Sequence, residues 1–167
     1  INSDKNLKIL FIGESSFAGV GVEQHKNGFA GHFSTVLSEQ LNHNINWKVY
    51  AKTGYNVHKI QQRIIPLIIE TTCDLLVIGI GGNDTFELNQ PKKWRQSIQL
   101  LIDDLRKKFP ETPILFAQLP TIEAFPAFPK EMKFVLGNHK DILAQHLKKQ
   151  VLNNENVYFP TEKINVK

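Results

Sequence analysis

The sequence predicts an α/β protein in which a five-stranded parallel sheet lies between layers of helices. Two patterns predict this class. Short, nearly continuous apolar runs, typical of buried parallel strands, alternate with longer segments whose apolar residues recur at helical spacing. Strand–helix alternation also favours right-handed crossovers with helices on both faces of the sheet. We therefore expect a flavodoxin-like, three-layer α/β/α architecture with the strand order 2-1-3-4-5.

Each expected element follows from a local pattern. The five strands are expected at 8–13, 46–54, 74–84, 112–120 and 156–160. The four helices are expected at 28–43, 56–70, 92–109 and 131–153. Pro66 predicts a kink or break in the second helix, and Gly137 leaves an interruption of the last one open. Trp94 recurs with the apolar residues of the third helix on one face, so we expect it in the core.

Length and composition indicate one domain spanning residues 1–167. With 41% hydrophobic and 22% charged residues, the chain has the composition of an ordinary soluble globular protein. Its formal charge of +4 comes from lysines scattered over the expected helices, without a recognition module, so no nucleic-acid partner is expected. The single cysteine, Cys73, rules out an intrachain disulfide. No run approaches the ~18 apolar residues of a membrane span.

The sequence indicates little about compartment or assembly. The chain begins at Ile1 rather than at a methionine, so we expect its natural N-terminus to be missing. No signal peptide is visible, and the cytoplasm and the periplasm or cell envelope both stay open as locations. Membrane contact and oligomeric state are also left open.

Three predicted strands end in short polar loops, where we expect the functional site. These loops are "GESS" (13–16), "KTGYN" (52–56) and "GGND" (81–84). Their strands are neighbours in the order 2-1-3, and open parallel sheets bind ligands beyond the carboxyl ends of their strands. Ser15 is therefore a candidate nucleophile. The N–H groups of Ser15 and Gly54 and the side-chain amide of Asn83 are candidate donors to the oxyanion of an acyl-transfer reaction.

Each of these residues also has a plainer interpretation. Ser15 can simply begin a loop, and Ser16 is better explained by a hydrogen bond within the turn. Asn83 can be a turn residue. Glu14 either supports the nucleophile turn or is solvated, and Asp84 either caps the next segment or supports the Asn83 loop.

Together the three loops resemble the SGNH (GDSL-type) hydrolases, serine esterases and lipases of flavodoxin-like fold. Ser15 matches the nucleophile motif of that family, although Glu14 stands where Asp is usual. Gly54 and Asn83 match the second and third motifs. The runs "FIGESSFAGVGVE" and "PKKWRQSIQLLIDDL" resemble a bacterial branch, and the likeness covers about residues 8–160. It implies hydrolysis of carboxylic esters through an acyl-enzyme.

The sequence departs from the family at the fourth motif, an Asp-x-x-His that provides the general base. None of the six histidines has an aspartate three residues before it. We expect the Asp/His pair beyond Lys167, so that this chain lacks the catalytic loop and C-terminal helix and is poorly active. A natural protein without this base is the other explanation. His58, at the expected start of a helix after the Gly54 loop, is the candidate base within the chain.

The expected substrate is a small-molecule ester. The stretch 119–134 combines three prolines with Phe125, Phe128 and Phe134, which are candidates for an apolar substrate pocket or else pack over the sheet edge. This loop favours acyl chains slightly over acetylated sugars. No metal-ligand spacing, P-loop or dinucleotide fingerprint is present, so no metal or cofactor is expected. The alternative function is a non-catalytic binding module that holds a small ligand at the strand ends.

Overall fold

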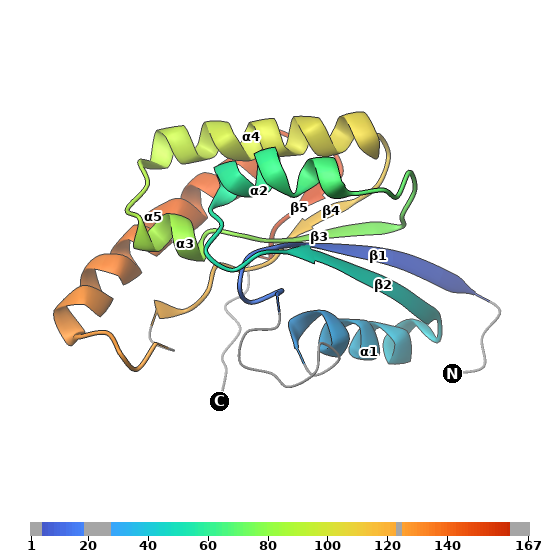
Figure 1. Ribbon diagram of the computed structural model, residues 1–167, viewed down its shortest axis with the longest axis horizontal. Helices are drawn as coiled ribbons and strands as arrows, with labels where there is room; N and C mark the ends of the chain where they lie inside the picture. Colours follow the sequence, from blue (N-terminus) through green and yellow to red (C-terminus); the bar gives the residue numbers. More distant parts are fainter. Residues whose placement is uncertain (1–4, 19–27, 123–124, 161–167) are drawn as a thin grey trace.

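The computed structural model describes residues 5–18, 28–122 and 125–160. The described residues form one parallel sheet in the order β2-β1-β3-β4-β5, which confirms the predicted class and strand order. The strands are β1 (Asn6–Gly13), β2 (Asn44–Ala51), β3 (Leu75–Gly79), β4 (Ile114–Phe116) and β5 (Val157–Tyr158). Figure 1 shows α1 (Phe29–Leu41) below the sheet, with α2 (Val57–Arg63), α4 (Pro91–Lys108) and α5 (Lys130–Leu152) above it.

The central strand β1 is buried on both faces, which explains its continuous apolar run. Leu10 and Ile12 belong to the large core cluster that also contains the buried faces of α2, α4 and α5. Ile9 and Phe11 belong to the smaller cluster beside α1. Successive side chains of a strand point to opposite faces, so the four residues serve both clusters alternately. Trp94 is 2% exposed in the larger cluster, as predicted.

The break predicted at Pro66 is confirmed. Helix α2 ends at Arg63, and a short 3-10 helix, η2 (Ile65–Leu67), follows with the proline in its first turn. Proline has no N–H to continue the helical bonding, which accounts for the break. By contrast, α5 runs through Gly137 without the interruption that its sequence left open.

The strand prediction over 74–84 extends too far. Strand β3 ends at Gly79, and the short helix α3 (Gly82–Phe86) occupies the remainder. Gly81, the residue before this helix, has no side chain to cap it. The N–H groups of Gly82 and Asn83 are instead bonded by Glu14 from the loop after β1. A local apolar pattern does not encode such a contact.

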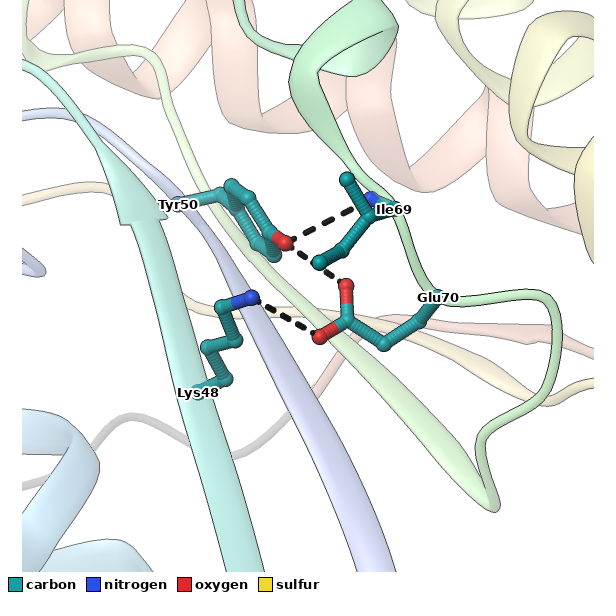
Figure 2. A network of polar contacts seen from close by, with 4 residues as sticks. All are labelled: Lys48, Tyr50, Ile69 and Glu70. Carbon is teal, nitrogen blue, oxygen red and sulfur yellow. Dashed lines mark hydrogen bonds and ion pairs between the residues drawn. The ribbon is translucent and has the colours of Figure 1, made fainter.

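A polar network ties strand β2 to the chain that leads into β3. In Figure 2, Glu70 lies against Lys48 and Tyr50; it accepts hydrogen bonds from the Tyr50 hydroxyl at 2.6 Å and from Lys48 Nζ at 3.0 Å. The Tyr50 hydroxyl also accepts the N–H of Ile69 at 3.5 Å. Desolvation by itself would raise the pKa of Glu70, but the hydrogen bonds from Tyr50 and Lys48 outweigh this effect, and the pKa is lowered to about 2. The network thus anchors the strand that precedes the Gly54 loop.

No helix in the described part of the chain is long and apolar enough to cross a membrane.

Candidate active site

The structure brings the carboxyl ends of β2, β1 and β3 to one level. Gly13 is in register with Ala51 on one side and with Gly79 on the other. Beyond the strands, the N–H of Lys52 donates to the Gly13 carbonyl at 3.1 Å, and the N–H of Glu14 donates to the Gly79 carbonyl at 3.0 Å. The three polar loops therefore start side by side.

Ser15 lies in a tight turn directly after β1. The N–H groups of Phe17 and Ala18 both donate to the Glu14 carbonyl, at 3.0 and 2.9 Å. The Phe17 ring, 4% exposed, stacks on Phe29 with the ring centroids 4.8 Å apart, which anchors the turn on α1. Ser15 is partly exposed, and no hydrogen bond between described residues uses its N–H or its hydroxyl. Among the described residues, nothing therefore competes with a ligand for these two groups.

Gly54 provides a second available N–H group. Its φ of +78° lies in the left-handed region that favours glycine. No atom lies within 4 Å of the position a Cβ would take, so backbone conformation rather than space selects glycine here. The residue is exposed, and its N–H has no acceptor among the described residues.

Asn83, in the first turn of α3, lies between the other two loops. Its side-chain Nδ2 donates to Glu14 Oε2 at 2.6 Å and to the Tyr55 carbonyl at 3.1 Å. Its backbone N–H also donates to Glu14 Oε2, at 3.0 Å. Both amide hydrogens of Asn83 are therefore engaged, one by the loop after β1 and the other by the loop after β2.

Glu14 turns inward rather than toward solvent. Its side chain is 2% exposed, and Oε1 accepts the N–H of Gly82 at 2.6 Å. Burial raises the pKa of Glu14, although the bonds from Asn83 and Gly82 oppose the shift and the charge of Asp84 adds to it. A Cβ on Gly82 would lie 2.7 Å from Oε1, so this close contact requires glycine. The solvated alternative for Glu14 is wrong.

Asp84 joins the loop after β2 to the loop after β3. The residue is 1% exposed; Oδ2 accepts the N–H of Val57, the first residue of α2, at 3.0 Å, and Oδ1 accepts Asn89 Nδ2 at 2.9 Å. Burial raises the pKa of Asp84 against these bonds. Glu14 and Asp84 thus connect the Asn83 loop to both of its neighbours.

The three phenylalanines predicted as pocket candidates lie in two environments. Phe125 and Phe128 pack edge-on against Phe86, with centroid distances of 5.2 and 5.5 Å. Phe134 is 72% exposed on α5. Sequence reasoning missed Phe86, although its place three residues after Asn83, within the same short helix, was a signal that could have pointed to it.

A small apolar pocket lies next to the Ser15 turn and involves none of the three predicted phenylalanines. It measures about 130 Å³, and its lining includes Ser16, Phe17, Phe29 and Ile80. Its walls thus come from the turn after β1, from the start of α1, from the end of β3 and from the segment that follows β4.

No described residue is placed as a base for Ser15. His58 is exposed in the first turn of α2 and lines a separate pocket of about 170 Å³ that includes Asp84 and Trp94 but not Ser15. His25 lies outside the described residues. Among the described residues there is no hydrogen bond from Ser15 to a histidine or a carboxylate, and no group of three or more His, Cys, Asp or Glu residues could hold a metal ion.

The fold and these strand-end loops agree with the family resemblance. The chain belongs to the GDSL-like lipase/acylhydrolase family, which it matches over residues 11–164. A search of curated proteins found no match.

Similar solved structures include esterases of the SGNH-hydrolase family. AlinE4, described as an SGNH-hydrolase family esterase, superposes with a TM-score of 0.70 at 18% identity, over 91% of this chain and 74% of its own. TesA gives 0.68 at 18% identity, over 91% and 76%. A family 3 carbohydrate esterase from Clostridium thermocellum gives 0.66 at 17% identity, over 93% and 77%. At these identities the likeness shows the fold.

Proposed function

We propose that the protein hydrolyses carboxylic esters through an acyl-enzyme formed on Ser15. Membership of the lipase/acylhydrolase family supports the reaction class. The observation that carries the assignment to this site is the meeting, at one sheet edge, of a serine hydroxyl and two backbone N–H groups that have no partner among the described residues and of a neutral side-chain amide.

In this mechanism Ser15 Oγ attacks the ester carbonyl and its proton passes to a base. The oxyanion that forms accepts hydrogen bonds from the N–H groups of Ser15 and Gly54 and from the Asn83 amide. The alcohol leaves with the proton, and water then releases the acyl group by the same steps. The base comes from a group outside the described residues, because Ser15 bonds to no described histidine or carboxylate.

The apolar surroundings of the site favour acyl esters as substrates. The aromatic cluster of Phe86, Phe125 and Phe128 begins on the same short helix as Asn83. The pocket of about 130 Å³ beside the Ser15 turn is close in size to the 150 Å³ apolar cavity that admits benzene. A chain-length series of p-nitrophenyl esters tests this preference, and hydrolysis confined to the acetate would contradict it.

The adjacent serines offer a matched pair for testing the function. Ser15→Ala is expected to abolish the hydrolysis of p-nitrophenyl butyrate, whereas Ser16→Ala keeps most of it. Equal rates for Ser15→Ala and the unaltered protein would show that the nucleophile is elsewhere. If no ester is hydrolysed and small-molecule binding survives Ser15→Ala, the non-catalytic binding module is the correct function.

A further inference from the structure

We propose that Glu14 is a positioning residue that decides which amide hydrogen of Asn83 reaches the oxyanion. The inference rests on the proposed function of the site. Both hydrogens of Asn83 Nδ2 are already bonded, one to Glu14 Oε2 at 2.6 Å and the other to the Tyr55 carbonyl at 3.1 Å. An oxyanion can therefore bond to Asn83 only by displacing one of these two acceptors.

The bond to Glu14 is the one that stays. It is the shorter of the two and its acceptor is a carboxylate; hydrogen bonds to an ionised group are about twice as strong as neutral ones. The bond to Tyr55 is longer and its acceptor is a neutral carbonyl. Tyr55 directly follows Gly54, whose N–H has no acceptor among the described residues, so the released Asn83 hydrogen points toward the loop that carries the second donor.

The Glu14 carboxylate is held in position by several hydrogen bonds. Its two oxygens accept three N–H donors, from the backbone of Gly82 and from the backbone and side chain of Asn83. The side chain is 2% exposed, and Gly82 is the residue type that permits the contact with Oε1. Glu14 acts through Asn83 and has no contact with the reacting atoms in this scheme. Glu14 is one methylene longer than the Asp that is usual at this position of the family motif, and its side chain reaches the first residues of α3.

Glu14→Gln removes one acceptor oxygen and places an NH₂ group against N–H donors. We expect kcat for p-nitrophenyl butyrate to fall by up to the ~10²–10³-fold that loss of one oxyanion donor costs, with little change in KM. Glu14→Asp keeps both carboxylate oxygens and recovers part of the rate. Glu87→Gln is the matched control, because this exposed carboxylate accepts Asn56 Nδ2 at 2.7 Å and Asn89 Nδ2 at 3.2 Å but takes no described hydrogen bond from the Asn83 side chain.

A double-variant comparison separates positioning from general damage. If Glu14 acts through Asn83, adding Glu14→Gln to Asn83→Ala leaves the rate at that of Asn83→Ala alone. Two losses that multiply in the double variant would overturn the proposal.

A measurement without substrate keeps the inference testable if the proposed function fails. In ¹⁵N-labelled protein, the Asn83 side-chain NH₂ and the Gly82 backbone N–H are expected to exchange slowly with solvent. Both signals should shift and exchange faster in Glu14→Gln and stay unchanged in Glu87→Gln. Unchanged Asn83 signals in Glu14→Gln would refute the positioning role, whatever the result with esters. Absence of all Ser15-dependent hydrolysis, with the expected NMR changes, would refute only the proposed function.

Discussion

Replacing Asp84 with alanine is expected to lower the free energy of unfolding by about 2–4 kcal/mol. The carboxylate is 1% exposed and accepts the Val57 N–H and Asn89 Nδ2. Hydrogen bonds to charged groups contribute about 1.5–3 kcal/mol each, and a buried donor left without an acceptor costs about 1–3 kcal/mol. The relief of a buried charge offsets part of this loss, since the same burial raises the pKa of Asp84.

Urea unfolding followed by circular dichroism measures the effect. For a chain of this length the loss corresponds to a fall in Tm of roughly 4–16 °C. Asp141→Ala, whose side chain is 66% exposed, is the control and should change stability by less than about 0.5 kcal/mol. If Asp84→Ala is as mild as the control, Asp84 does not hold the two loops together.

Three further predictions concern Asp84, Tyr50 and Ser15. The loss of stability caused by Asp84→Asn, measured against wild type, should be larger at pH 5 than at pH 7. Because the pKa of Asp84 is raised in the folded state, the folded protein binds more protons here than the unfolded chain as the pH falls toward 3.8, and this stabilises wild type but not the variant. Urea titrations at both pH values measure the difference, and a loss that shrinks on acidification would contradict the raised pKa. Tyr50→Phe should lower the free energy of unfolding by about 1–2 kcal/mol at pH 7 and raise the pKa of Glu70 from about 2, because Glu70 loses the hydrogen bond from the Tyr50 hydroxyl. NMR of the Glu70 carboxyl group measures this pKa. In wild type the lowered pKa contributes stability that is present above pH 4.5 and is lost as the pH falls toward 2. No described residue bonds to Ser15 as a base, so added imidazole, after subtraction of the rate without protein, should accelerate hydrolysis by wild type but not by Ser15→Ala; equal acceleration of both would show that the rate does not pass through Ser15.

Much of the fold could be predicted because the faces that each helix or strand buries determine the local pattern of apolar residues. The apolar runs of β1 and β3 and the helical spacing around Trp94 reflect which faces each element buries. The meeting of the loops that carry Ser15, Gly54 and Asn83 then follows from the order of parallel strands alone.

The supporting contacts could not be predicted because they join residues far apart in the chain. From the sequence, Glu14 could either support the nucleophile turn or be solvated. In the structure it is buried and accepts hydrogen bonds from Gly82 and Asn83, which lie 68 and 69 residues further along the chain. Glu14 accepts the N–H groups at the start of helix α3, and the local sequence, which does not contain this contact, predicts strand there. Phe86 was missed because its aromatic neighbours, Phe125 and Phe128, come from a distant loop.

Mass spectrometry of the protein, quenched in acid during turnover of p-nitrophenyl butyrate, shows directly whether Ser15 carries the acyl group. We expect one butyryl group, located on Ser15 by peptide mapping, that is present in Ser16→Ala and absent in Ser15→Ala. An acyl group on another residue, or an adduct that persists in Ser15→Ala, would contradict the assignment of Ser15 as nucleophile.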